Sequence, residues 1–376
     1  MEKIKVAVVR AENYENLDAA VKEAMELAEF SIEKDARVLL KPNIMSDAAP
    51  DSGLITNPRF VKAVAEYVRQ YSANIKVGDC SSKQSFEGTA ASLKAAGLKE
   101  TLQGSAEVVN LDSDYKWVMF NNRYADKIMI AKGVMDSEVL ITVPKLKTHI
   151  FTFFTGAVKN LYGCVYGVQK QVLHSKIRDN DDFSKMHLEL YQLLKPKFAI
   201  MDAIDVMEGD GPSAGPIRRM GLIIASRDAL ALDYVAVRLA GFKPGEVPLL
   251  KVALREGILD ADRIEVVGLP IEKAAMHLRA PSTLAPGKIF GNPIFRLSVD
   301  ESKCIKCGAC EKICPVKAVR LNPYPTWDEG KCIKCFCCHE ACLQKAIVVK
   351  KERSKSDLMR AAKYRAIGAV KKLLRR

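Results

Sequence analysis

Over the first 270 residues, short apolar runs alternate with segments whose apolar residues recur at helical spacing. The short runs predict strands at Ile4–Val9, Arg37–Leu40, Ile75–Val77, Val139–Val143, Phe198–Met201, Gly221–Ala225 and Ile264–Val267. The other segments predict helices at Leu17–Phe30, Arg59–Tyr71, Ala229–Ala240 and Leu249–Arg255. Asn57 and Asp228 stand just before two of these helices, where a side-chain oxygen can cap free N–H groups. This alternation is typical of an α/β domain, with a mostly parallel sheet and helices on both faces.

Polar side chains follow the predicted strands where each strand ends, which is where open α/β sheets bind ligands. Lys41 and Asn43 follow one strand, and Asp79 and Cys80 follow another. Cys80 could be a nucleophile or a metal ligand, but a single cysteine is more often a small apolar core residue. The glycine-rich loop at Gly209–Gly215 matches neither a Walker A loop nor a dinucleotide-binding loop, so nucleotide binding is not supported.

The densest polar group follows the fourth predicted strand. It consists of Lys145, Lys147 and His149, and a predicted helical segment adds Lys159 and Asn160 soon afterwards. Two cations and an imidazole at a strand end suit an anionic ligand with carboxylate or phosphate oxygens. The alternative is a solvated loop whose lysines pair with surface acids. We take these five residues as the candidate catalytic or binding residues of the domain.

The most specific signal in the chain is a doubled cysteine run. Cys304–Cys314 and Cys332–Cys342 both have the spacing C-x2-C-x2-C-x3-C, which holds 4Fe–4S clusters in bacterial-type ferredoxins. The runs lie 28 residues apart, and eight of 18 aligned positions are identical. A zinc ribbon would instead need separate CxxC pairs for its ion. Disulfides are not expected in a chain without a secretion signal.

In this motif the fourth cysteine of each run binds the cluster of the other run. The interlocking assigns one cluster to Cys304, Cys307, Cys310 and Cys342, and the second to Cys332, Cys335, Cys338 and Cys314. Two departures occur, because Leu343 replaces the proline expected after the last cysteine and Cys337 is an extra neighbour of Cys338. The two-residue gap favours Cys338 as the ligand, so we expect Cys337 to lie beside the cluster without binding it.

Composition fits a folded iron–sulfur protein of a reducing compartment. The 376 residues are 48% hydrophobic and 27% charged, which suits a large domain joined to a small one. Eight of the 11 cysteines fall in the two runs, which favours a cytoplasmic and anaerobic setting. No secretion signal opens the chain, and no apolar run is long enough to span a bilayer.

Positive charge is concentrated at the end of the chain. The net charge is +13, and the stretch from Lys350 to Arg376 holds 11 lysines and arginines against two acidic residues. Apolar residues recur at helical spacing from Leu358 to Leu373, which predicts a basic amphipathic helix. Such a helix suits an anionic membrane surface or an acidic partner, or it could fold back on its own domain. Because it lacks interleaved aromatic residues, no nucleic acid partner is expected.

Several ordered motifs of residues 1–270 resemble domain-of-unknown-function family 362. They are Lys41-Pro42-Asn43, Pro144-Lys145-Leu146-Lys147-Thr148-His149, Thr155-Gly156-Ala157-Val158-Lys159-Asn160-Leu161-Tyr162-Gly163, Asp202 to Pro212, and Asp228 to Asp233. Members of that family often carry a C-terminal two-cluster ferredoxin unit, and residues 298–350 are similar to bacterial two-cluster ferredoxins. The resemblance implies an iron–sulfur electron-transfer protein and leaves the chemistry of the N-terminal domain open.

These patterns predict four segments: an α/β domain at 1–270, a linker at 271–297, a small α+β two-cluster 4Fe–4S ferredoxin domain at 298–350 and a basic tail helix at 351–376. We expect low-potential electron transfer through two 4Fe–4S clusters, to an acidic redox partner or to a site in the N-terminal domain. The alternatives are an iron–sulfur reductase acting on a small anionic substrate or bound cofactor in the α/β domain, and a reductive maturation factor for another metalloenzyme. A cytoplasmic location is expected, with peripheral membrane contact through the tail.

Removing the basic tail should leave the cluster content unchanged, because its charge lies outside both predicted domains. Binding to anionic vesicles or to an acidic redox partner should weaken and lose most of its dependence on salt. Iron counting and vesicle sedimentation at two salt concentrations measure the two effects. Loss of iron or unfolding of the shortened chain would show that the tail is a structural brace instead.

Overall fold

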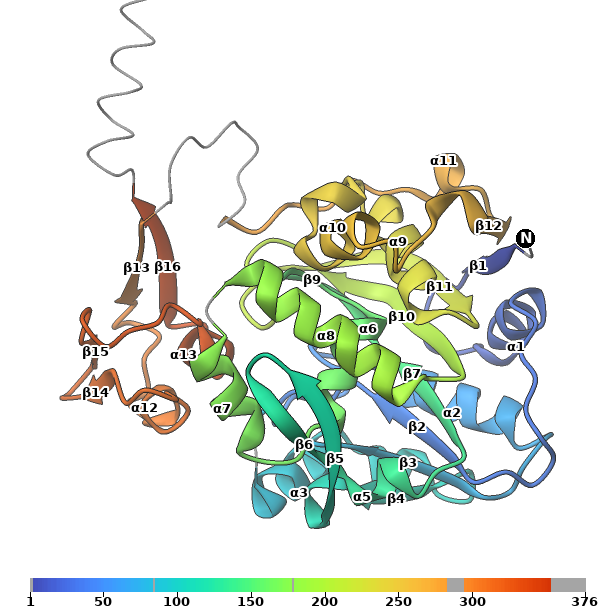
Figure 1. Cartoon of the computed structure of the whole chain (residues 1–376), viewed down its shortest axis with the longest axis horizontal. Coiled ribbons are helices and arrows are strands. Elements are labelled where there is room, and N and C mark those ends of the chain that lie inside the picture. Colours follow the sequence, from blue (N-terminus) through green and yellow to red (C-terminus); the bar gives the residue numbers. More distant parts are fainter. Residues whose placement is uncertain (1–2, 84, 178, 283–293, 353–376) are drawn as a thin grey trace, which may run out of the picture.

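The computed structural model describes residues 3–83, 85–177, 179–282 and 294–352. Its centre is a mixed, mostly parallel sheet of ten strands within these residues (Figure 1). Eight of the strands follow the order β12-β1-β11-β10-β7-β2-β3-β4, and β8 pairs with β10 and β9. The strands are β1 (Ile4–Arg10), β2 (Val38–Pro42), β3 (Ile75–Asp79), β4 (Glu107–Asn110), β7 (Val139–Val143), β8 (Lys145–His149), β9 (Phe153–Thr155), β10 (Phe198–Met207), β11 (Ile217–Ser226) and β12 (Ile264–Gly268).

Helices cover both faces of this sheet because successive strand residues point to opposite sides. In β2, Val38 and Leu40 face a core that includes α1 and α2, whereas Leu39 faces the core beneath α8. Helices α6, α9 and α10 contribute to the core on the same side as α8 (Figure 1). The helices of the domain are α1 (Asp18–Leu27), α2 (Pro58–Val68), α3 (Phe86–Ala95), α4 (Leu98–Thr101), α5 (Lys132–Met135), α6 (Ala157–Asn160), α7 (Gln169–Lys176), α8 (Asn180–Leu194), α9 (Ala229–Leu239), α10 (Pro248–Arg255) and α11 (Ile271–Ala274).

The α/β class predicted from the sequence is confirmed, and so are the seven predicted strands and four predicted helices, with shifted ends. The two capping predictions are also confirmed. Asn57 accepts a hydrogen bond from the N–H of Arg59 at the start of α2, and Asp228 accepts two at the start of α9. The apolar runs identified these elements because their burial dominates the local pattern.

Two parts of the domain differ from the sequence-based expectation. Lys145–His149 form strand β8, and all five residues are buried, so the alternative of a solvated loop is wrong. Buried lysines interrupt the apolar alternation by which a strand is recognised. Strands β5 (Tyr115–Asn122) and β6 (Ala125–Ala131) form a separate antiparallel hairpin, which the pattern did not reveal because exposed aromatic and charged residues alternate along it.

The C-terminal unit is built from two similar halves. It contains the strand pairs β13 (Ile294–Val299) with β16 (Ile347–Glu352) and β14 (Val319–Leu321) with β15 (Pro325–Trp327), and the helices α12 (Ala309–Lys312) and α13 (Cys337–Glu340). Left-handed backbone recurs at equivalent positions of the halves, namely Lys306 and Lys334, Gly308 and Phe336, and Lys317 and Lys345. The sequence repeat is therefore also a repeat of the backbone around the cysteines.

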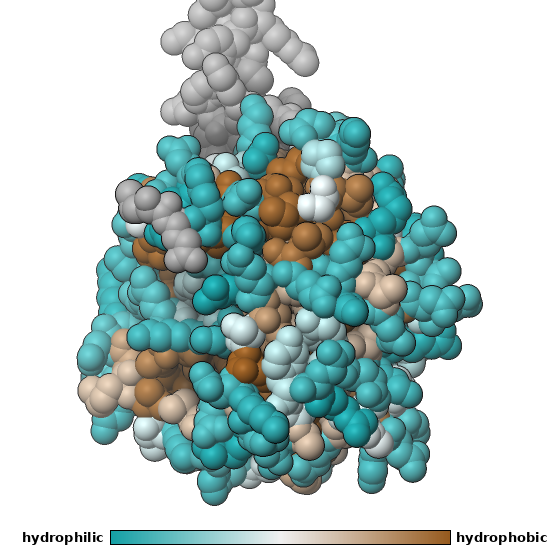
Figure 2. Space-filling view, turned by 90° about the vertical axis from the view of Figure 1, so that its right-hand side faces the viewer, coloured by the Kyte–Doolittle hydropathy of each residue, from teal (hydrophilic) through white to brown (hydrophobic). Residues whose placement is uncertain are grey.

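The ferredoxin unit is docked on the α/β domain through α13 (Figure 1). Ile150, in the turn after β8, is 1% exposed and belongs to a core that also holds Phe336 and Ile347. Nδ1 of the buried His339 lies 2.7 Å from the Ile347 carbonyl oxygen, and Nε2 lies 3.4 Å from that of Asp210. Side chains of both units therefore pack in one core. The face of the molecule away from this contact is mostly hydrophilic (Figure 2).

The expected linker and tail are only partly described. Helix α11 and the residues up to Ser282 lie in the first part of the expected linker, where the N–H of Gly209 donates to the Arg279 carbonyl at 2.7 Å. Strand β16 continues to Glu352, so a truncation that tests the tail should follow this residue. The remaining tail, 353–376, and the linker residues 283–293 lie outside the described residues. No helix in the described part of the chain is long and apolar enough to cross a membrane.

Candidate functional site

The carboxyl ends of β2, β3 and β8 meet beneath helix α13 of the ferredoxin unit. Side chains from these strands, from α6 and from α13 surround a cavity of about 120 Å³. The α/β domain contributes Lys41, Lys147 and Lys159 among others, and α13 contributes Cys337 and Glu340. The cavity lies where an open α/β sheet binds ligands, and a cysteine-rich segment forms one of its walls.

A buried ion pair forms the floor of the cavity. Nζ of Lys41 lies 2.7 Å from Oδ1 of Asp79, and both side chains are almost fully buried. Asn160 accepts a hydrogen bond from Lys41 Nζ at 3.0 Å and donates one to the Lys41 carbonyl at 2.9 Å. Glycine is needed at Gly163 because a Cβ there would lie 2.3 Å from Asp79 Oδ1. Breaking such a pair by removing one partner typically costs about 3–5 kcal/mol, so these residues fix the strand ends.

Helix α6 presents Lys159 to the cavity. Its first N–H groups, those of Ala157 and Val158, donate to the Asp233 carboxylate at 2.6 and 3.0 Å. A Cβ at Gly156 would lie 2.1 Å from Asp233 Oδ1, so only glycine lets this carboxylate reach the helix. Burial raises the pKa of Asp233 to about 7, and the two N–H groups oppose that shift. The motif from Gly156 to Asn160 and the distant Asp233 thus hold Lys159 in place.

Lys147 and Lys159 both line the cavity and make no ion pair with a carboxylate among the described residues. Lys147 is 0% exposed, and its Nζ donates to Asn43 Oδ1 and to the Leu54 carbonyl, both at 2.7 Å. Burial, and then the charge of Lys159, lowers the pKa of Lys147 to about 7. The half-buried Lys159 makes no hydrogen bond or ion pair within the described ranges, and burial lowers its pKa as well.

His149 and Glu340 meet across the contact between the two units. Nδ1 of His149 accepts hydrogen bonds from the N–H groups of Phe151 and Thr152, so the ring proton of the neutral form lies on Nε2. That Nε2 is 3.2 Å from Oε1 of Glu340, although the two atoms are not aligned as a hydrogen bond. Burial lowers the pKa of His149 well below its usual value and raises the pKa of Glu340.

Four of the five candidate residues from the sequence line this cavity: Lys147, His149, Lys159 and Asn160. Lys145 does not. Its Nζ donates to Asp202 Oδ2 at 2.9 Å and to the Tyr14 hydroxyl at 2.7 Å, in a buried network outside the cavity. Strand-end position therefore predicted Lys147 and Lys159 correctly as cavity residues. Lys145 instead holds β8 to β10 through Asp202.

Glu340 is the main cavity residue that the sequence reasoning missed. A signal was present in the repeat, because Glu340 occupies the position of Lys312 and Cys337 that of Ala309. The second half thus departs from the first in helix α13, which faces the α/β domain. Residues that depart from an internal repeat mark a surface with a different environment.

The four cysteines expected to bind the first cluster lie around one pocket. Cys304, Cys307, Cys310 and Cys342 line one small, mostly apolar pocket, with Cys342 supplied by the other run. The N–H groups of Ala318 and Ala346 donate to the sulfurs of Cys314 and Cys342 at 3.2 and 3.3 Å, at equivalent places in the two halves. Sulfurs that converge on one pocket and accept backbone hydrogen bonds fit a 4Fe–4S cluster.

Cys80 also lines the cavity but is 3% exposed. Burial raises the pKa of its thiol well above the usual value, and Lys170 only partly opposes this shift. Because the thiolate is the reactive form, the structure favours a packing role for Cys80 over a nucleophilic one.

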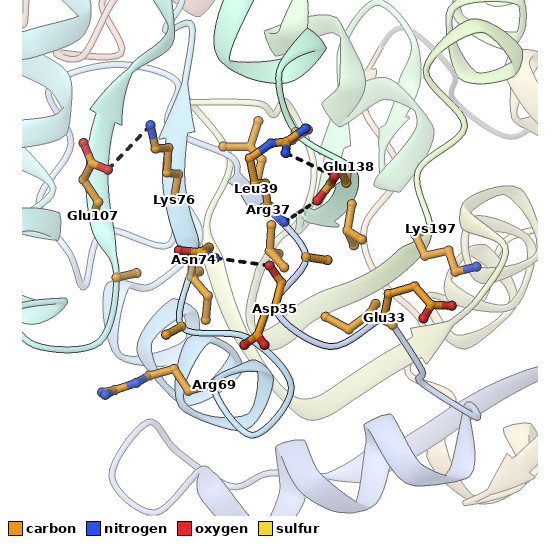
Figure 3. Close-up of a pocket in the computed structure, with 18 of the residues that line it drawn as sticks. Glu33, Asp35, Arg37, Leu39, Arg69, Asn74, Lys76, Glu107, Glu138 and Lys197 are labelled. Atoms are coloured by element: carbon orange, nitrogen blue, oxygen red, sulfur yellow. Dashed lines mark hydrogen bonds and ion pairs between the residues drawn. The ribbon is translucent and has the colours of Figure 1, made fainter.

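A larger hollow lies at the opposite, amino end of the strands (Figure 3). Its volume is about 1320 Å³, but its charged side chains are exposed and several of them are already paired. Lys76 lies 3.6 Å from Glu107, and Arg37 lies 3.1 Å from Glu138. Exposed pairs of this kind contribute little energy, and this edge of the sheet is not where such folds bind ligands. The hollow is therefore not the candidate site.

The lowered pKa of Lys147 predicts how stability depends on pH. The folded protein loses this proton near pH 7 and the unfolded chain near 10.5, so stability should rise with pH between these values. Lys147→Met should remove up to about 4 kcal/mol of that rise. Anaerobic denaturation between pH 6.5 and 10 measures the change in the free energy of unfolding, with Lys76→Met as the exposed control. The same pH profile in parent and Lys147→Met would contradict the buried, unpaired placement.

Comparisons with known proteins identify the family of each of the two regions. The family described as "Domain of unknown function (DUF362)" matches residues 38–238, and a 4Fe-4S binding domain matches residues 297–320. A thylakoid-associated protein of Synechocystis sp. is 30% identical over 297 residues, which are 75% of this chain and 89% of that protein. The lactate racemase apoprotein from Thermoanaerobacterium thermosaccharolyticum has 15% sequence identity and a TM-score of 0.40, over 62% of this chain and 57% of that one. The chain belongs to the DUF362 family and carries a C-terminal 4Fe–4S ferredoxin-type domain.

Proposed function

We propose that the protein transfers electrons through two 4Fe–4S clusters to the cavity between its two units. The crossed cysteine pocket and the repeated backbone support two interlocked clusters. Ligation by cysteine alone lacks the histidines that raise Rieske potentials, so we expect potentials on the order of −400 mV or lower.

The observation that carries the proposal is the wall formed by Cys337 and Glu340. Cys337 stands between Cys335 and Cys338, two expected ligands of the second cluster, and it lines the cavity. The second cluster would therefore lie beside the cationic side chains at the strand ends. This placement favours an iron–sulfur reductase acting on a bound small molecule over a carrier that only docks partners.

Electrons would enter at the other cluster. Cys307 is exposed, and its neighbour Ile305 is 64% exposed, so this end of the ferredoxin unit is open to a redox partner. Exposed Lys345 follows Cys342, an expected ligand of that cluster, and would steer an acidic partner towards it. Lys303 adds less, because its Nζ is already 2.8 Å from Asp300.

Peripheral membrane contact through the basic tail is a further part of the proposal. The charge of this segment supports it. The similar protein from Synechocystis sp., which is named as thylakoid-associated, supports it independently. The cytoplasmic location expected from the cysteine content is compatible with such contact.

Anaerobically purified protein should contain about eight iron atoms per chain and show interacting 4Fe–4S centres by EPR after reduction. Cys314→Ala should lower the iron content to about four, because it removes the crossed ligand of the second cluster. Cys337→Ala is the matched control and should keep the full content. Stoichiometric zinc in the parent, or a cluster lost from Cys337→Ala, would contradict the assignment.

A further inference from the structure

The cavity holds more positive than negative side chains. Its lysines are Lys41, Lys147, Lys159 and Lys170, and its carboxylates are Asp79 and Glu340. Asp79 is paired with Lys41 at 2.7 Å, and Glu340 faces His149 at 3.2 Å. With the four lysines protonated and both carboxylates ionised, these side chains carry a net charge of +2. A buried ammonium is costly unless an anion compensates it.

Hydrogen-bond donors at the cavity also lack partners. The three N–H bonds of Lys159 are unused among the described residues, and the hydroxyl of Thr155 and Nε2 of His149 are buried without a hydrogen bond. Lys147 and Lys170 each donate two hydrogen bonds to oxygens of the protein, so each ammonium has one N–H left. These groups can donate to several oxygens of one ligand.

The size of the cavity limits the ligand. Its volume of about 120 Å³ is roughly ten times the space that one water molecule needs by the same measure. It is well below the roughly 300–1,000 Å³ of sites for drug-sized ligands and cofactors. A molecule of a few heavy atoms fits inside the cavity, whereas most of a nucleotide or a flavin would lie outside it.

We propose that the cavity binds a small oxyanion with two negative charges, a phosphate or a short dicarboxylate, with Lys159 and Lys147 as its main charge partners. Thr155 and His149 donate hydrogen bonds to the same ligand. This inference deepens the proposed function, because it names the ligand class at the cavity to which electrons are delivered. The binding itself requires no electron transfer.

Calorimetric titration of the anaerobic, full-length protein with inorganic phosphate, succinate and acetate tests the ligand class. At least one of the two dianions should bind with a stoichiometry of one, and acetate should bind at least tenfold more weakly. Tighter binding of phosphate would identify a phosphate-type ligand, and tighter binding of succinate a dicarboxylate. Failure of both dianions, or acetate binding as tightly as they do, would overturn the proposal.

Variants locate the binding. Lys159→Met should weaken binding of the dianion by at least roughly thirtyfold, because the substitution removes a charge-assisted contact. Thr155→Val keeps the shape of the side chain and should weaken dianion binding by a few fold. Lys76→Met is the matched control, since this exposed lysine lines the other hollow (Figure 3), and it should bind like the parent. Equal affinity in Lys159→Met and the parent would place the anion elsewhere.

Iron content and EPR of the same samples separate the two proposals. Reducible clusters without dianion binding would overturn the ligand class and leave the electron-transfer proposal standing. Dianion binding to a protein with no reducible cluster would overturn the electron-transfer proposal and leave the ligand class standing. Because the Lys159 and Thr155 changes leave every assigned cluster ligand in place, their iron content should equal that of the parent.

Discussion

Burial of lysine side chains at the carboxyl ends of the sheet is the constraint on which the site depends. An ammonium group taken out of water needs oxygen partners, and the partners define the architecture. Lys41 is held by Asp79, and Lys145 by Asp202. Glycine beside the first pair lets the chains approach closely enough. Lys159 is different. Two hydrogen bonds to Asp233 fix the start of its helix, whereas its own ammonium makes no hydrogen bond or ion pair among the described residues and feels Glu340 only at longer range. Such an arrangement is typical of a binding site rather than of a structural brace.

The ferredoxin unit closes this site instead of merely extending the chain. Ile150 of the α/β domain is part of the ferredoxin core, and His339 of the ferredoxin unit reaches the loop that follows β10. Helix α13 supplies both the docking contact and one wall of the cavity. Electron transfer and ligand binding would therefore share one short segment, in which cysteines expected to bind a cluster alternate with residues that face the cavity.

The sequence predicted the sheet, the capped helices and several cavity residues because each depends on local information. Apolar runs mark strands, and Asn57 and Asp228 mark helix starts through their own hydrogen bonds. The direction of Lys145 could not be predicted, since it depends on a register shift where β8 pairs with β10. The contact of Glu340 with His149 joins residues from different units. In the sequence, only the difference between Glu340 and Lys312, its equivalent in the first cysteine run, indicated this contact.

If the cavity lies beside one cluster, a bound dianion and an electron added to that cluster repel each other. An anaerobic redox titration of the intact protein, with and without saturating phosphate, tests this directly. One cluster potential should fall by tens of millivolts with phosphate, because the bound charges repel an added electron over several ångströms in protein, while the other potential should change less. Two potentials that phosphate leaves unchanged, in a sample shown to bind phosphate, would show that the cavity does not lie beside a cluster.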